Sequence, residues 1–283
     1  MAVLPDADVE STGAPTVPVP ARDRARPNVS LFGGRVLVTV AVLALWELAS
    51  RTVVDPFWIG RPTAIAAALV DWVRTGVLAT HLGPTLAETA IGFLLGGTIG
   101  VVLGFLLGYL RVLDALLTPF VTAVYTLPKI ALAPLVLLWF GIGFSAKAAL
   151  SALLVFFLVF FNTHAGVREV DPDLVDAARL MGASRGRLLR FVYLPHAAAW
   201  VFAGLRLSLP YALVGAVVGE MLAANRGIGY LLATAANQFD TVHAFAALGV
   251  LIALGLLLNA GVSVVEARVQ RWQPQRLHRT EGW

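Results

Sequence analysis

The chain has 283 residues, of which 58% are hydrophobic and only 13% charged, and its mean hydropathy is +0.80. Soluble domains carry roughly 25% charged residues, so this composition excludes a soluble globular protein and predicts an all-α membrane protein. The lack of cysteine excludes disulfides and thiolate metal sites. The net charge is +4, and the basic residues are not interleaved with aromatic residues as is typical of nucleic-acid binding.

The N-terminal region is rich in proline, alanine and charge, without an apolar run. It lacks the apolar core of a secretory signal, so we expect residues 1–35 to be a disordered cytoplasmic tail. A first span is predicted at 36–54, close to the roughly 20 residues that a bilayer requires.

Residues 55–82 are expected outside the membrane. Pro62 opens an amphipathic pattern that predicts a helix on the outer surface, and Gly76 is expected to end this helix. Its apolar face would carry Ile65, Leu69, Trp72 and Val73.

The second span, at about 84–110, contains a stripe of glycines at every fourth position. Such a stripe allows another helix to approach closely, so we expect tight packing inside a bundle. The helix-packing residues are Gly92, Gly96, Gly100, Gly104 and Gly108.

The third span, at about 119–140, is interrupted by Pro128 and Pro134, with Lys129 between them. Proline in a span kinks the helix, which is tolerated where the helix lines a cavity. The remaining spans are predicted at 146–162, 197–222 and 243–265, which gives six transmembrane helices in total.

The transmembrane domain is therefore expected to cover 36–272, and residues 273–283 to form a cytoplasmic C-terminal tail. Between the last two spans, residues 225–240 contain two glycines and a short apolar run, which indicates a re-entrant or surface helix that meets an external partner.

The longest polar stretch, 168–195, separates the fourth and fifth spans. Asp171 followed by Pro172 is typical of a helix start, and Gly182 of a helix end. Between them, one face is small and apolar, with Leu174, Ala177, Ala178 and Met181 at helical spacing.

Ser184 is expected to cap a second short helix, which Pro195 would end. One side of it would be lined by Leu188, Phe191 and Val192, and its surface decorated by Arg185, Arg187 and Arg190. The pattern thus predicts two short helices that bend at Gly182 and expose an apolar face without a partner in their own chain.

This stretch resembles the EAA loop of bacterial ABC-importer permeases, through which the membrane subunit docks on its ATPase. The matching positions are Asp176-Ala177-Ala178, Gly182, Val192 and Leu194-Pro195, with Asp176 where Glu is usual and Val192 where Ile is usual. The alternative is an ordinary cytoplasmic loop with a helical hairpin. The resemblance implies ATPase-coupling roles for Asp176, Ala177, Ala178, Leu180, Met181, Gly182, Ala183, Ser184, Arg185, Leu194 and Pro195.

Two further segments, 126–147 and 204–232, are similar to the nitrate/sulfonate/taurine branch of these permeases, and the resemblance covers 56–274. It implies a type I ABC-importer permease fold in the bacterial inner membrane. It also implies a homodimer that works with two ATPase subunits and an extracytoplasmic solute-binding protein.

Charge placement predicts the orientation. With 168–195 in the cytoplasm, 14 basic residues lie inside and five outside, Lys147 among the five, while Lys129 and Arg206 remain at membrane depth. Both termini are therefore expected to be cytoplasmic.

The sequence contains no phosphate loop of the Gly-x-x-x-x-Gly-Lys-Ser/Thr type. We therefore expect no catalytic residues, no metal site and no cofactor in this chain, with ATP and magnesium bound by the partner ATPase. The expected function is to form the path for a small anion of the sulfonate, taurine or nitrate type. The alternative substrates for the same kind of importer are a pyrimidine (thiamine) or flavin precursor, or an aromatic carboxylate. Alternative functions of another class are a stand-alone secondary transporter, a channel or a membrane-embedded enzyme.

Charged residues at membrane depth are candidates for the substrate path. The candidates here are Pro128, Lys129, Arg206 and Glu220. The structural alternative is that Lys129 and Arg206 reach an interface or pair with Glu220 or Glu88, and that Glu220 pairs rather than gates. Glu88 is expected near a span end.

Overall fold

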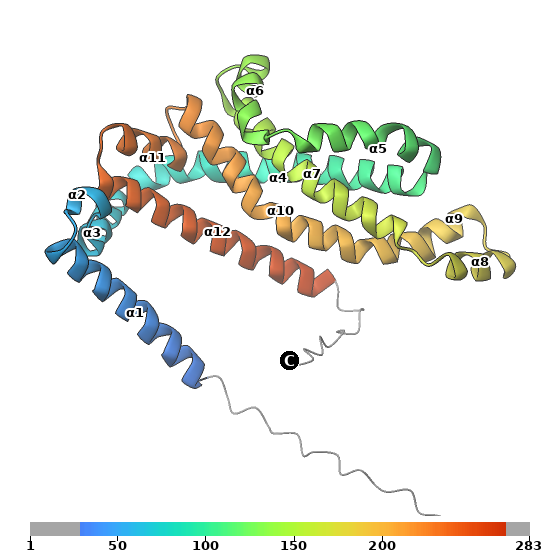
Figure 1. Ribbon diagram of the computed structural model, residues 1–283, viewed down its shortest axis with the longest axis horizontal. Helices are drawn as coiled ribbons and strands as arrows, with labels where there is room; N and C mark the ends of the chain where they lie inside the picture. Colours follow the sequence, from blue (N-terminus) through green and yellow to red (C-terminus); the bar gives the residue numbers. More distant parts are fainter. Residues whose placement is uncertain (1–28, 270–283) are drawn as a thin grey trace, which may run out of the picture. The chain divides into compact units, whose positions relative to one another are not determined.

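A computed structural model describes residues 29–269, all of whose regular elements are helical (Figure 1). The chain divides into two compact units, Met1–Leu45 and Trp46–Trp283. In the first unit, the described residues belong to α1 (Val29–Thr52), whose side chains are exposed from Gly33 to Leu45. The predicted tail of 1–35 is therefore helical from Val29, while 1–28 and the predicted C-terminal tail lie outside the described residues.

The second unit contains the end of α1 and all other elements. They are α2 (Pro56–Ile59), α3 (Pro62–Arg74), α4 (Val77–Tyr109), α5 (Arg111–Thr126), η1 (Lys129–Leu132), α6 (Ala133–Phe140), α7 (Phe144–Arg168), α8 (Pro172–Leu180), α9 (Arg185–Leu188), the π-helical η2 (Leu189–Tyr193), α10 (Leu194–Ala223), α11 (Ile228–Asn237) and α12 (Thr241–Val269).

Between residues 29 and 269, five helical stretches are long and apolar enough to cross a membrane. The bent pair Arg111–Thr126 and Lys129–Phe140 would be a sixth span, with an angle of 88° between its halves. The prediction of an all-helical, multi-span membrane protein is confirmed. The third span differs in detail: it begins earlier, at Arg111, and only Pro128 lies at the break, while Pro134 lies in the first turn of α6.

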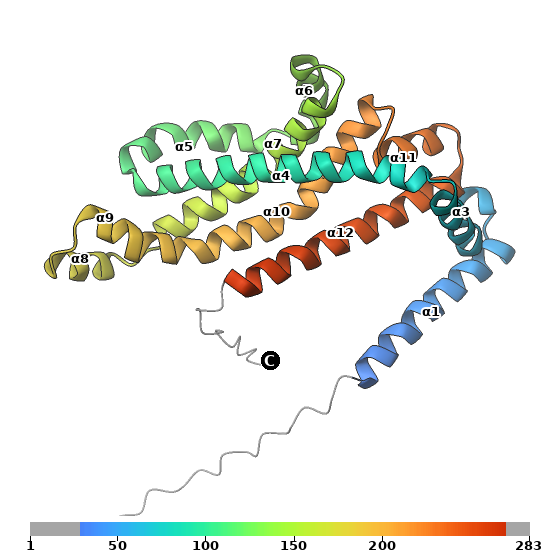
Figure 2. The same cartoon turned by 180° about the vertical axis from the view of Figure 1, so that it is seen from behind.

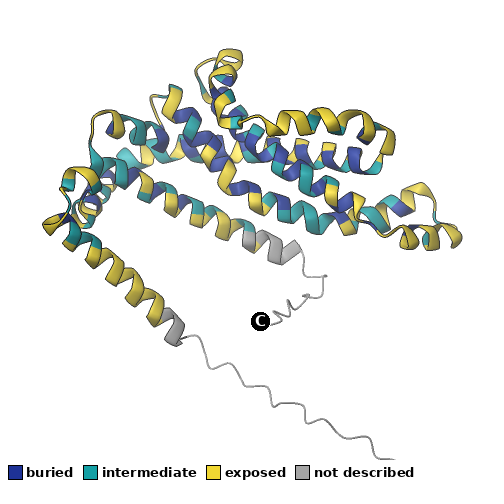
Figure 3. Ribbon diagram, in the orientation of Figure 1, coloured by how far each residue is buried: buried dark blue, intermediate teal, exposed yellow. Residues whose placement is uncertain are grey.

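The centre of the bundle is formed by α4, α7 and α10, which run side by side in both views (Figures 1 and 2). All five glycines of the α4 stripe are buried against α7. A Cβ at Gly100 would lie 2.9 Å from the Phe156 carbonyl oxygen, and one at Gly104 would lie 2.6 Å from the Phe160 carbonyl oxygen. A Cβ at these distances would clash with the α7 backbone, so glycine is required for the two helices to approach this closely. Figure 3 shows the buried residues concentrated along these three helices.

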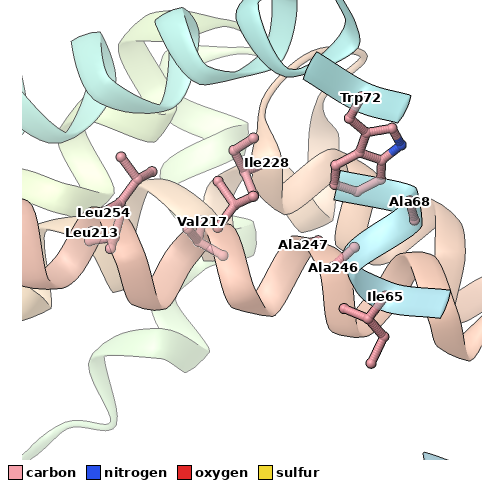
Figure 4. Close-up of a cluster of buried hydrophobic side chains, with 10 residues drawn as sticks. Ile65, Ala68, Trp72, Leu213, Val217, Ile228, Ala246, Ala247 and Leu254 are labelled. Carbon is pink, nitrogen blue, oxygen red and sulfur yellow. The ribbon is translucent and has the colours of Figure 1, made fainter. Parts of the chain in front are cut away.

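A second core joins α3, α10, α11 and α12 (Figure 4). The predicted surface helix is α3, and its Ile65, Ala68 and Trp72 are buried in this core. Val73, predicted on the same face, is 63% exposed and does not join this core. The predicted helix between the last two spans is α11, which packs on α10 and α12.

Candidate coupling surface and translocation path

The polar stretch between α7 and α10 folds as a helical hairpin. Asp171 caps α8, because its carboxylate accepts a hydrogen bond of 2.9 Å from the Asp173 N–H, and Pro172 occupies the first turn. This is the start that the sequence predicts. Figure 1 places α8 and α9 at the end of the bundle far from α3 and α11.

Gly182 makes the bend. Its φ of +83° is in the left-handed region, which side chains disfavour, and a Cβ built there would meet nothing within 4 Å. The Gly182 N–H donates to the Arg179 carbonyl and the Ala183 N–H to the Ala178 carbonyl, at 2.8 and 3.0 Å. The glycine is therefore required by backbone conformation, while the space around it is open.

The hairpin has a small core of its own, which fixes its shape. Val170, Val175 and Leu188 are buried there, and four side chains are partly buried around them: Ala178, Ala183, Val192 and Tyr193. Val175 was not predicted as a core residue. Ala178 was predicted on the partnerless face, but it packs inward.

The tip of the hairpin exposes large apolar side chains. Leu180 is 90% exposed, Met181 81% and Leu174 54%. Ala177 is exposed beside them. Phe191, predicted beside Leu188, is also exposed, at 69%. An exposed apolar group on a preformed hairpin is typical of a protein-binding surface.

Two sequence predictions about the second helix were wrong. Ser184 lies at the N-cap position of α9, but its hydroxyl forms no capping hydrogen bond. Pro195 does not end the helix: Leu194 and Pro195 lie in the first turn of α10, and the helical path continues from Arg185 to Ala223. The π-helical turn η2 precedes them, so its wider hydrogen bonding accommodates the missing proline N–H.

Asp176 lies on the surface of α8. Its carboxylate pairs with Arg179 at 3.0 Å, and both side chains are more than 60% exposed. An exposed pair of this kind contributes little to stability, so both side chains are available for a partner.

The predicted path residues do not form one site. Pro128 and Lys129 lie at the bend between α5 and η1, whereas Arg206 is exposed on α10 and Glu220 is buried on the same helix. Fourteen residues separate the last two, which corresponds to about 21 Å along a helix.

Lys129 is held by groups that leave its charge uncompensated. Its Nζ donates to the Tyr125 carbonyl at 3.0 Å and lies 4.1 Å from the centre of the Tyr125 ring and 5.3 Å from that of Phe157. Phe161 packs edge-on against Tyr125, with 4.8 Å between ring centres. The result is an ammonium group on an aromatic surface beside the break in the third span.

A buried ion pair joins α4 to α7, and its cation is Lys147 instead of Lys129 or Arg206, the two considered from sequence as partners of Glu88. Glu88 is 1% exposed and Lys147 7%, and the Lys147 ammonium pairs with Glu88 Oε1. Lys147, which the sequence analysis counts among the outer charges, is thus buried in the bundle and not free in a loop, and Glu88 has a buried partner. Both charges are removed from solvent, which is costly unless they pair.

Glu220 acts in the same region as a cap for α11. Its carboxylate accepts the Gly229 N–H and the Thr85 hydroxyl, each at 2.7 Å. The Thr85 oxygen accepts the Ile228 N–H at 2.9 Å, and His81 Nδ1 accepts the Gly227 N–H at 3.1 Å. Three successive N–H groups at the start of α11 are therefore satisfied by side chains of α4 and α10, which supports a structural role for Glu220.

The structure thus defines a multi-pass membrane protein with a glycine-packed bundle and an exposed apolar hairpin. Residues 96–271 match the family described as "Binding-protein-dependent transport system inner membrane component". The chain belongs to this family: it is an inner-membrane permease subunit of the ABC-importer class and not an enzyme. Importers of this class work with ATPase and solute-binding partners.

Three curated relatives illustrate the family. The chain is 36% identical over 240 residues to the putative aliphatic sulfonates transport permease protein SsuC of Escherichia coli, covering 83% of this chain and 90% of that one. It is 35% identical over 241 residues to the riboflavin transport system permease protein RibX of Chloroflexus aurantiacus (85% and 90% covered). It is 31% identical over 240 residues to the formylaminopyrimidine transport permease protein ThiX of Halalkalibacterium halodurans (85% and 96% covered).

Solved structures support the fold. A chain of the inward-facing MetNI methionine ABC transporter aligns with a TM-score of 0.59 and 20% identity, over 67% of this chain and 94% of that chain. A chain of an amino acid ABC transporter aligns with a TM-score of 0.53 and 20% identity, over 72% and 98%. The predicted type I importer permease fold is therefore confirmed.

Proposed function

We propose that this chain forms, as a homodimer, the translocation path of an ATP-driven importer for a small anion of the sulfonate, taurine or nitrate type. In this proposal, a binding protein delivers the anion outside, and two ATPase subunits dock on the hairpins of 168–195 inside, where both chain termini also lie. ATP and magnesium bind the ATPase and not this chain.

The observation that carries the proposal is the hairpin tip. Leu174, Leu180 and Met181 are exposed, although the hairpin has its own core and a defined bend. A stand-alone carrier or channel has no need for such a surface. Exposed apolar side chains on both halves of the third span, among them Phe120 on α5 and Trp139 on α6, support contact with a second copy within the membrane.

The anionic substrate class is supported by Lys129, whose ammonium meets a carbonyl and aromatic rings but no carboxylate. A name among the relatives, that of the aliphatic sulfonates permease SsuC, agrees with this class. A second candidate is a pyrimidine or flavin precursor or an aromatic carboxylate. The ring cluster of Tyr125, Phe157 and Phe161 favours it, because a planar substrate would stack there.

Uptake by proteoliposomes distinguishes the two candidates. The complex purified from its host would be offered labelled ethanesulfonate, taurine, nitrate, benzoate, formylaminopyrimidine and riboflavin. We expect ATP-dependent uptake of a sulfonate or nitrate, reduced about tenfold by Lys129→Met and largely retained by Lys129→Arg, since a charge-assisted hydrogen bond contributes about 1.5–3 kcal/mol. Uptake of riboflavin or formylaminopyrimidine alone, unaffected by Lys129→Met, would overturn the anion assignment.

A further inference from the structure

A polar cavity of about 220 Å³ lies where the hairpin joins the bundle. Three helices each contribute an arginine to its lining: Arg111 from the start of α5, Arg168 from the end of α7 and Arg179 from α8. Tyr109 and Tyr193 also line it and pack edge to face, with 5.1 Å between ring centres. The wall is therefore rich in guanidinium groups and aromatic edges.

The charges around this cavity are not balanced. Arg168 pairs with Asp114 at 3.1 Å, and Arg179 with Asp176 at 3.0 Å. Asp114 also accepts from His164 at 2.7 Å, and Asp176 itself lines the cavity. Arg111 forms no ion pair with any residue between 29 and 269. One guanidinium thus faces the cavity without a countercharge.

The cavity also lies at the boundary of the apolar spans. Tyr109 is the last residue of α4 and Arg168 the last of α7. Immediately beside it, Leu106 and Val112 expose apolar side chains, Val112 to 74%. Positive charge, tyrosine and exposed aliphatic side chains therefore meet in the order that a phospholipid presents phosphate, interface and acyl chain.

We propose that this cavity binds the phosphate headgroup of an anionic phospholipid of the surrounding membrane. Arg111 supplies the uncompensated charge, Arg168 and Arg179 add donors, and the acyl chains lie along Leu106 and Val112. Because the arginines belong to α5, α7 and α8, one bound phosphate connects the hairpin to two membrane helices. A bound anionic lipid would therefore restrict movement of the hairpin relative to α5 and α7.

Native mass spectrometry of the full-length chain in detergent tests the site. Dioleoyl phosphatidylglycerol would be titrated beside dioleoyl phosphatidylcholine and sodium phosphate, for the wild type, Arg111→Gln and Arg111→Lys. Arg74→Gln is the matched control, since Arg74 is an exposed arginine on α3, at the far end of the bundle. We expect preferential binding of phosphatidylglycerol, weakened about fivefold by Arg111→Gln and much less by Arg111→Lys or Arg74→Gln.

Three results would overturn the proposal. The first is equal affinity for the two lipids, and the second is phosphatidylglycerol binding that Arg111→Gln leaves unchanged. The third is binding of sodium phosphate that displaces the lipid at comparable concentration, which would identify a free anion as the ligand.

Discussion

Replacing Gly182 by aspartate is expected to abolish ATPase binding while the membrane bundle stays folded. The left-handed φ of +83° imposes about 1–2 kcal/mol of local strain on a side chain. A Cβ there meets no atom within 4 Å, so the core of the chain is undisturbed. The new carboxylate would be buried, unpaired, between Met181 and the docked partner, which costs several kcal/mol and thus far more than tenfold in affinity.

Gly76→Asp is the matched control. Gly76 has nearly the same φ, +78°, and equally open surroundings, but it lies between α3 and α4 at the other end of the bundle. Both variants should be monodisperse in mild detergent and unfold at similar temperatures, and only Gly182→Asp should lose the co-purified ATPase. Equal loss in both variants, or unfolding of Gly182→Asp alone, would contradict the assigned role.

Removing the Lys147 charge is expected to destabilise the bundle by about 3–5 kcal/mol, because Lys147→Met leaves the Glu88 carboxylate buried without its partner. Glu220 lies close enough to Glu88 to interact with it electrostatically, so an unpaired Glu88 would also face a second carboxylate. Thermal unfolding in detergent measures the loss.

The double variant Lys147→Met/Glu88→Gln should recover most of the stability, since it removes both buried charges together. Lys129→Met is the matched control, because Lys129 is half-buried but has no carboxylate partner. A single variant as stable as the wild type would contradict the ion pair, and a double variant no better than the single would locate the defect in packing.

The hairpin could be predicted from sequence because its signals are local. The Asp171 cap, Pro172 and the left-handed Gly182 lie within one or two turns of the backbone that they shape. The glycine stripe of α4 was equally readable, since its four-residue spacing requires a close helix neighbour.

Tertiary contacts could not be predicted from the sequence in this way. The partner of Glu88 lies 59 positions along the chain, and no local pattern specifies it. Val175 was missed and Ala178 packs inward because they contact Leu188 and Val170, which lie outside α8. The only sequence signal for such a pair is the presence of charged residues in apolar spans, because each buried charge needs a partner. Treating Lys147 as a charge that needs a partner, and not as a loop charge, would have allowed the Lys147–Glu88 ion pair to be predicted.

A single-cysteine cross-link tests the docking claim most directly. The chain has no cysteine, so Leu180→Cys places a unique thiol on a side chain that is 90% exposed at the hairpin tip. Trp58→Cys, at a position 71% exposed on α2, is the control for the opposite end. With a thiol-directed photo-cross-linker in the complex from its host, we predict an adduct between Leu180→Cys and the ATPase and none with Trp58→Cys. An ATPase adduct with Trp58→Cys, and none with Leu180→Cys, would contradict the account.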